Sequence, residues 1–251
     1  MKSKKIENKK FYSKHLSPNF NIKKKRNINF VIIHYTGMVP IKKTIEKFKD
    51  SKSKVSCHWL ISSKGKIYKI VDEKNEAWHC GKSRWKKFIN LNKCSVGIEL
   101  DNPGHGSSYK TFPNTQMNAL AFLLKKILVK YNINNKNVLG HSDISPERKL
   151  DPGEFFDWHY LAKKKLAYFP PIKKKILIRN IFFQIGDKGN TILELKILLK
   201  KIGYACILNS KFDIKFKLII EAFQRRFLPI SINGIIDDVV YQRIIEVYKN
   251  S

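Results

Sequence analysis

The feature that most constrains the fold is a short run at residues 28–35, INFVIIHY, in which apolar and β-branched side chains dominate. A run of this length and composition is typical of a strand that is buried on both faces. Both faces of such a strand need other elements packed over them. The sequence therefore predicts a sheet covered by helices, with His34 near the end of one buried strand.

Other segments fit the same plan. Strand-like runs at 57–62 and 66–71 are joined by Ser-Lys-Gly at 63–65, which predicts a hairpin, and further strands are expected at 94–101 and 138–139. The predicted helices begin at Pro40, at Asn114 or Thr115, and at Asp157, the last of them running to about residue 167. Together these elements predict an α/β fold, with a central mixed β-sheet flanked by helices.

The clearest break in the chain is Phe169-Pro170-Pro171, which is followed by three lysines. Beyond this break, helical patterns recur at 191–202, 214–227 and 238–247. Three short helices can form a small bundle. We therefore expect three parts, namely a basic, polar N-terminal segment at 1–26, an α/β domain at 27–170 and a small three-helix domain at 178–251.

The charge of the chain is strongly unbalanced. Fifty Lys and Arg residues against twenty Asp and Glu give a formal net charge of +30. Such a charge attracts polyanions, including nucleic acids, acidic lipids and anionic wall polymers. The excess is mostly lysine, spread along the chain beside many Ile and Asn residues. A drift of amino-acid usage toward AT-rich codons would produce the same composition without any function for the charge. The charge therefore identifies no partner, and no specific nucleic-acid motif accompanies it.

Targeting signals are not apparent. No run approaches the roughly 18 apolar residues of a membrane span, so no transmembrane segment is expected. Residues 1–26 carry ten basic residues and one acid, but lack the apolar stretch of a signal peptide. The four cysteines form no CxxC pair and are expected to be small, buried or half-buried apolar side chains.

A candidate metal site comes from His34, His141 and Asp151. Both histidines follow or end predicted strands, and Asp151 lies ten residues after His141. Two imidazoles and a carboxylate are enough to hold Zn²⁺ while leaving a fourth position for water, as a catalytic zinc requires. Each residue taken alone is weak evidence, since a histidine at the end of an apolar strand is more often part of the core.

The surrounding motifs strengthen this interpretation, because they resemble those of type-2 zinc-dependent N-acetylmuramoyl-L-alanine amidases, which share the fold of peptidoglycan-recognition proteins. The similar segments follow the order of that family over about residues 17–165: Ser17–Phe20, Val31–Thr36, Ser56–Ile61, Ala77–Ser83, Asn92–Glu99, Gly140–Pro146, Arg148-Lys149 and Asp151–Gly153. Cys80 departs from the family pattern, in which a small residue, usually Ala, is expected.

The resemblance implies one Zn²⁺ per chain, held by His34, His141 and Asp151. It implies that Glu99 acts as general base and acid, and that Lys149 stabilises the oxyanion. The implied reaction is hydrolysis of the amide between N-acetylmuramic acid and L-alanine, in peptidoglycan or muropeptides. Seven residues are candidates for substrate contact: Tyr35, His58, Trp78, His79, Asn92, His105 and Arg148. Of these, His58 lies in a predicted strand, where a histidine is more often a packing residue.

The C-terminal segment resembles the three-helix peptidoglycan-binding domain attached to many wall hydrolases, through Gly186–Gly189, Ala222–Arg225 and Asn233–Asp237. The usual threonine after Phe212-Asp213 is missing, which puts glycan affinity in doubt. A wall-binding domain favours the cell envelope (periplasm), whereas the missing signal peptide favours the cytoplasm. A non-catalytic peptidoglycan receptor and a nucleic-acid binder stay open as alternatives, and the oligomeric state is not predicted.

Overall fold

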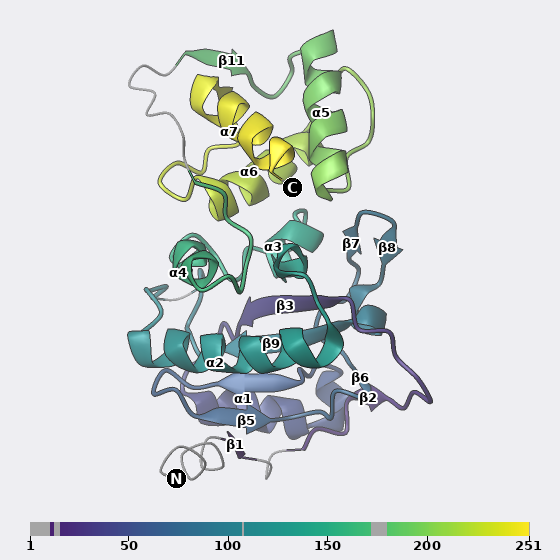
Figure 1. The fold of residues 1–251 in the computed structure, drawn as a ribbon, viewed down its shortest axis with the longest axis vertical. Helices are drawn as coiled ribbons and strands as arrows, with labels where there is room; N and C mark the ends of the chain where they lie inside the picture. The colour runs from purple at the N-terminus through teal and green to yellow at the C-terminus, as the bar shows by residue number, and fades with distance from the viewer. Residues whose placement is uncertain (1–10, 13–15, 107, 172–179, 251) are drawn as a thin grey trace. The chain divides into compact units, whose positions relative to one another are not determined.

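The computed structural model describes residues 11–12, 16–106, 108–171 and 180–250. The chain divides into two compact units, shown with the element labels in Figure 1. The first unit holds residues 1–81 and 91–138, and the second holds 82–90 and 139–251. Residues 139–171 thus belong to the same compact unit as the C-terminal helices, whereas the sequence predicts a break near residue 170. The domain boundaries stay a prediction.

A six-stranded mixed sheet has the strand order β1-β5-β4-β9-β3-β10. Its strands are β1 (Phe11–Tyr12), β3 (Phe30–Tyr35), β4 (Trp59–Ile61), β5 (Ile67–Lys69), β9 (Ser95–Leu100) and β10 (Val138–Gly140). β3 and β4 both run parallel to β9, while β4 and β5 form the predicted antiparallel hairpin. In β3 the residues from Phe30 to His34 are all buried. The prediction of a buried strand here is confirmed.

Two helices of the first unit pack on this sheet. The helix α1 (Ile41–Lys49) inserts Phe48, with Ile41 and Ile45, into a cluster that includes Leu60 of β4. The longer helix α2 (Asn114–Tyr131) lies alongside the sheet and buries nine side chains. Short 3-10 turns η2 (Ser51–Ser53), η3 (Leu91–Cys94) and η4 (Asn135–Asn137) connect the elements. The predicted class, a central mixed sheet flanked by helices, is confirmed.

Part of the basic N-terminal segment packs against the rest of the first unit. Strand β2 (Phe20–Asn21) pairs with β6 (Glu76–Ala77). The guanidinium of Arg26 donates to the carbonyl oxygens of Glu73 (2.7 Å), Asn92 (2.7 Å) and Ser95 (2.7 Å). Residues 16–26 therefore belong to the folded unit, while 1–10 and 13–15 lie outside the described residues.

The second unit is mainly helical. Its helices are α3 (His141–Ile144), α4 (Trp158–Lys163), α5 (Asn190–Ile202), α6 (Ile214–Phe227) and α7 (Asp238–Lys249). The unit also contains two two-stranded sheets, β7 (Arg84–Trp85) with β8 (Phe88–Ile89), and β11 (Ile181–Phe183) with β12 (Ile236–Asp237). Asp213 and Asp237 cap α6 and α7 by accepting from backbone N–H groups. The three predicted C-terminal helices are confirmed.

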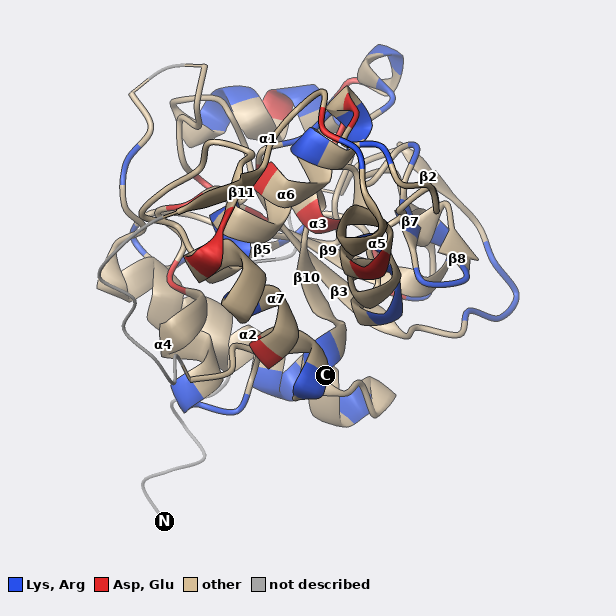
Figure 2. Cartoon of the chain, turned by 90° about the horizontal axis from the view of Figure 1, so that it is seen from above, with Lys and Arg blue, Asp and Glu red and all other residues tan. Residues whose placement is uncertain are grey.

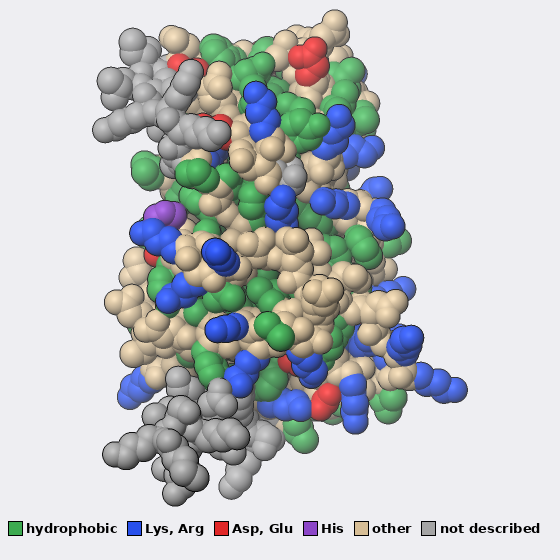
Figure 3. Space-filling model, viewed as in Figure 1, with side chains coloured by type: hydrophobic (Ala, Val, Ile, Leu, Met, Phe, Trp, Pro, Cys, Tyr) green, Lys and Arg blue, Asp and Glu red, His purple; other side chains and the backbone are tan. Residues whose placement is uncertain are grey.

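The basic residues do not gather in one place on the surfaces shown. Figure 2 shows Lys and Arg on many elements, among them α2 and α5. On the face in Figure 3, their side chains are scattered between hydrophobic and uncharged ones. Among the described helices, none is both long enough and apolar enough to span a membrane.

Candidate metal centre

His34 lies in the first unit, near the end of β3, and is 1% exposed. The parallel register of β3 with β9 places Glu99 opposite His34, and Gly97 opposite Ile32. Because alternate residues of a strand share a face, His34, Gly97 and Glu99 lie on the same face of the sheet. The sheet therefore sets the predicted metal ligand and the predicted general base side by side.

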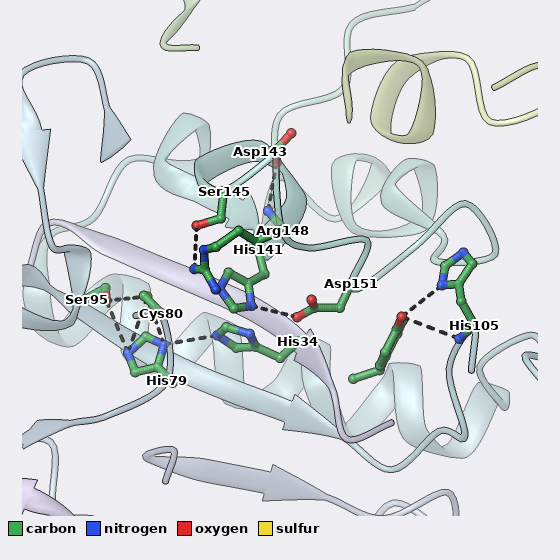
Figure 4. A network of polar contacts seen from close by, with 12 residues as sticks. His34, His79, Cys80, Ser95, His105, His141, Asp143, Ser145, Arg148 and Asp151 are labelled. Atoms are coloured by element: carbon green, nitrogen blue, oxygen red, sulfur yellow. Dashed lines mark hydrogen bonds and ion pairs between the residues drawn. The ribbon is translucent and has the colours of Figure 1, made fainter. Parts of the chain in front are cut away.

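His34 contacts a second histidine. Its Nε2 atom lies 3.0 Å from Nδ1 of His79, and the His79 ring also contacts Cys80 Sγ (3.1 Å from Nδ1) and Ser95 Oγ (3.3 Å from Nε2). Figure 4 shows these contacts as one continuous network. His34, His79 and Cys80 are all buried, and their potential ligand atoms lie within 4.8 Å of one another. Sequence reasoning missed this grouping, although the unusual Cys80 was a signal for it.

His141 and Asp151 form a buried pair in the second unit. His141 begins the helix α3 directly after β10, and its Nδ1 lies 3.0 Å from Oδ2 of Asp151. The two side chains are 3% and 8% exposed. The backbone N–H of Ser142 donates to the carbonyl oxygen of Asp151 at 2.8 Å, which ties the loop that carries Asp151 back to the start of α3.

A buried ion pair anchors the same short helix. Asp143 is 1% exposed, and its carboxylate accepts from Arg226 Nη1 (2.7 Å), Tyr204 Oη (2.7 Å) and the backbone N–H of Gly140 (2.8 Å). Arg226 belongs to α6, and its guanidinium also stacks 4.0 Å from the centre of the Trp158 ring. Arg226 of α6 and Tyr204, two residues after the end of α5, thus hold the helix on which His141 lies.

The two predicted catalytic residues occupy different settings. Glu99 is half-buried on β9. Burial raises the pKa of the Cys57 thiol well above its usual value, and the negative charge of Glu99 adds to this rise. Lys149 is half-buried in the loop after α3, and its backbone N–H donates to Ser145 O at 3.0 Å.

Besides His79, two of the seven candidates for substrate contact make hydrogen bonds that stabilise the backbone around them. His58 is fully buried, with Nδ1 accepting from the Gly97 N–H (2.9 Å) and Nε2 within 3.1 Å of the Asn75 carbonyl oxygen. Asn92 accepts from the backbone N–H groups of both His79 (3.1 Å) and Cys80 (2.7 Å). Asn92 therefore fixes the turn that carries the His79 ring.

The others differ in exposure. Tyr35 and His105 are half-buried and hydrogen-bonded to each other, at 2.8 Å from Oη to Nδ1. Trp78 is also half-buried, whereas Arg148 is exposed and donates to the Lys82 carbonyl oxygen at 2.7 Å. Tyr35, His105 and Trp78 thus keep surface that a substrate can reach, and their role as substrate contacts stays a prediction.

Comparisons with known proteins identify the family of the chain. The N-acetylmuramoyl-L-alanine amidase family model matches residues 24–154, just over half of the chain. The chain is 33% identical over 225 residues to the N-acetylmuramoyl-L-alanine amidase AmiD of Escherichia coli, covering 82% of this chain and 77% of AmiD. It is 32% identical over 169 residues to the 1,6-anhydro-N-acetylmuramyl-L-alanine amidase AmpD of Haemophilus influenzae, covering 59% of this chain and 90% of AmpD.

The fold points to the same relatives. The structure of E. coli AmiD in complex with the substrate anhydro-N-acetylmuramic acid-L-Ala-D-γ-Glu-L-Lys superposes with a TM-score of 0.76 at 30% identity, covering 90% of both chains. AmpDh3 of Pseudomonas aeruginosa gives a TM-score of 0.74 at 25% identity, covering 90% of this chain and 93% of AmpDh3. The chain therefore belongs to the N-acetylmuramoyl-L-alanine amidase family and is an amide hydrolase that cleaves between N-acetylmuramic acid and L-alanine in peptidoglycan or its fragments.

Proposed function

We propose that this amidase works with one Zn²⁺, held by His34, His141 and Asp151. The buried pair of His141 and Asp151, 3.0 Å apart, is the observation that carries the proposal. An imidazole and a carboxylate in contact inside the protein are a donor set suited to zinc, and His34 adds a second buried imidazole. The residues present therefore fit the metal that the family resemblance implies.

The proposed roles of Glu99 and Lys149 follow from their chemistry. A zinc ion at this site would lower the pKa of a bound water toward about 7 and polarise the scissile carbonyl. Glu99 takes a proton from the attacking water and returns it to the departing amine of L-alanine. Lys149 places its ammonium beside the oxygen that becomes negatively charged in the tetrahedral intermediate. Tyr35, His105 and Trp78 are proposed to contact the sugar and the stem peptide.

For the substrate, we propose anhydro-muropeptides as well as intact wall. The structural relative AmiD is described in complex with an anhydro-muropeptide, and AmpD is named as a 1,6-anhydro-muramyl amidase. The helices α5 to α7 are proposed to bind peptidoglycan, and tethering of this kind raises the effective concentration of substrate at the amidase. Wall binding would favour action in the cell envelope, with the cytoplasm as the alternative.

The test is a digestion of purified sacculi and of soluble anhydro-muropeptides, with and without a zinc chelator, with the products identified by mass. We expect stem peptides beginning with L-alanine to be released from both, and the release to stop with chelator and resume when zinc is restored. Glu99→Gln, which keeps the size of the side chain but removes the base, is the matched variant and should bind zinc without turnover. If neither substrate loses its stem peptide with zinc present, the proposal fails.

A second measurement addresses the C-terminal helices. Purified sacculi are pelleted with the full chain carrying Glu99→Gln, so that the wall is not digested. We expect the protein to pellet with the wall and to remain with it at high salt. High salt is the informative condition, because it screens the non-specific attraction of a chain with a net charge of +30. Loss of all binding at high salt would remove the support for a wall-binding role.

A further inference from the structure

The hydroxyl group of Ser95 has one hydrogen to donate. Ser95 Oγ lies 2.6 Å from the carbonyl oxygen of Leu91, and a carbonyl oxygen can only accept. The single hydrogen of Ser95 therefore goes to Leu91. Toward Nε2 of His79, at 3.3 Å, the serine oxygen must act as the acceptor. It follows that the hydrogen of the neutral His79 ring lies on Nε2.

The other nitrogen of His79 is then a lone-pair acceptor. In a neutral imidazole only one nitrogen carries the hydrogen, and the other nitrogen carries a lone pair. With the hydrogen of His79 on Nε2, facing Ser95 Oγ, its Nδ1 is the accepting nitrogen. Nε2 of His34, 3.0 Å away, is then the donor. A hydrogen on Nε2 of His34 leaves Nδ1 as the nitrogen of that ring without a hydrogen, and therefore as the one that can bind a metal.

We propose that His79 is a positioning residue for the metal ligand His34: it selects the tautomer and fixes the ring so that Nδ1 of His34 binds zinc. The relay runs from Leu91 O through Ser95 and His79 to His34. Metal-bound histidines commonly donate their second ring hydrogen to an acceptor in this way, which fixes tautomer and orientation. The inference rests on the proposed zinc site, and substrate contact by His79 stays a separate prediction.

The position of the His79 ring is itself fixed by the backbone around it. The ring lies against Gly97 of β9 so closely that a Cβ atom at this glycine would come within 2.4 Å of Cγ of His79. On the other side, the side chain of Asn92 accepts from the backbone N–H groups of His79 and Cys80. Because packing and hydrogen bonds already fix the His79 ring, it can orient the His34 ring without a further loss of conformational entropy.

Cys80 offers a rival explanation, because it makes His34, His79 and Cys80 a possible ligand set of their own. Around a tetrahedral zinc, two ring nitrogens lie roughly 3.3 Å apart, and a nitrogen and a sulfur roughly 3.6 Å apart, given the usual bond lengths. The observed separations are 3.0 Å from His34 to His79 and 3.1 Å from His79 to Cys80. Both are shorter than a shared metal requires and match direct hydrogen bonds, so the relay is favoured.

The experiment compares zinc affinity in full-length variants by competition with a chromophoric chelator. His79→Leu removes the acceptor and should weaken zinc binding by roughly 10- to 100-fold, the usual effect of losing such a partner. His79→Asn places an amide oxygen near the position of Nδ1 and should stay within a few-fold of the wild type. Cys80→Ala, the residue expected from the family pattern, is the matched control and should bind zinc as the wild type does.

A spectrum of the cobalt-substituted protein separates the two explanations. The relay predicts no thiolate-to-cobalt charge-transfer band, in the wild type or in Cys80→Ala. A band that is present in the wild type and lost in Cys80→Ala would overturn the relay and make Cys80 a ligand. If His79→Leu fails to fold by circular dichroism, Ser95→Ala serves instead, since removing the serine frees the tautomer of His79 and should weaken zinc binding several-fold.

The outcomes also separate this inference from the proposed function. A wild-type protein that binds no zinc would overturn the proposed metal site, and the role of His79 with it. A wild type that binds zinc, with folded His79→Leu and Ser95→Ala variants that bind it equally well, would overturn the role of His79 alone. Weak binding by His79→Asn as well as by His79→Leu would also contradict the relay, because the amide restores the acceptor.

Discussion

The two proposed histidine ligands are held by different chemistry. In the first unit, His34 contacts His79, and that ring in turn contacts a serine and a thiol, none of which carries a formal negative charge. In the second unit, His141 contacts the carboxylate of Asp151, and its helix α3 is held by a second carboxylate, Asp143, paired with Arg226. A hydrogen bond between neutral groups can select the tautomer of a histidine. Removing one partner of a buried ion pair instead leaves an uncompensated buried charge, which strongly lowers the free energy of unfolding.

The largest effect is expected for Asp151→Ala, which removes the negatively charged member of the proposed ligand set. We expect zinc content after gel filtration and hydrolysis of muropeptides both to fall to background, a greater loss than the roughly 10- to 100-fold expected for outer partners of a ligand. Asp151→Cys is the control, because a thiolate is also a zinc ligand and should retain the metal. Full zinc retention by Asp151→Ala would show that the carboxylate orients His141 rather than binding the metal.

The next effect concerns the ion pair that anchors α3. In Arg226→Met, the Asp143 carboxylate stays buried without its cation, although the Tyr204 hydroxyl and the Gly140 N–H still donate to it. We expect the free energy of unfolding to fall by about 3 kcal/mol, the lower end for breaking a buried pair. Urea unfolding at pH 7 measures this change.

Two further variants test how the charge and the planar group of Arg226 each contribute to stability. Arg226→Lys keeps the charge but loses the planar group that stacks on Trp158, and should be less destabilised than Arg226→Met. The double variant Asp143→Asn, Arg226→Met removes both charges and should recover part of the loss. A change below about 1 kcal/mol in Arg226→Met would place this pair among weak, solvent-screened ones.

The sequence predicted local elements better than the contacts between them. The bounds of α6, Ile214–Phe227, were predicted correctly, because a capping aspartate and a regular apolar period are both local signals. The helix after Asp157 was expected to reach about residue 167 but ends at Lys163. Lys165 adopts a left-handed backbone with φ of +59°, which ends the helix and which no glycine announces.

In the site, too, individual residues were easier to predict than the contacts between them. Family motifs identified His34, His141 and Asp151, because each lies inside a recognisable segment. The contact of His34 with His79 spans 45 residues, and that of Asp143 with Arg226 spans 83. Packing of the sheet and helices decides such pairs, and no local pattern encodes them. His79 and Arg226 could therefore be noticed in the sequence, but the partner of each could not.

The burial of His58 in the first unit predicts a pH dependence of stability. Burial, followed by the charge of Arg26, lowers the pKa of His58 to about 3, against the opposing effects of Asn75, Glu73 and Asp72. The unfolded chain therefore binds a proton near pH 6.5 that the folded chain does not take up until about pH 3. Stability from this group is present above pH 6.5 and is lost progressively as the pH falls toward 3.

From this shift we expect the free energy of unfolding to be lower by about 2 kcal/mol at pH 5 than at pH 7. Unfolding curves at several pH values measure it. His58→Gln should be less stable at pH 7, because it cannot replace both ring contacts, but its stability should depend less on pH between 7 and 5. An equal slope in the wild type and in His58→Gln would assign the pH dependence to other groups.

The smallest effect is expected for Tyr204→Phe, which removes one neutral donor from Asp143 and leaves its cation in place. Tyr204 is 1% exposed, and its hydroxyl donates to the carboxylate at 2.7 Å. A hydrogen bond to a charged group contributes about 1.5 kcal/mol, so the loss should be about half of that for Arg226→Met. Because both side chains bind the same carboxylate, the double variant should not show the sum of the two losses. Strict additivity in urea unfolding would mean that Tyr204 and Arg226 stabilise the second unit independently, and that α3 is held by packing rather than by the shared charge of Asp143.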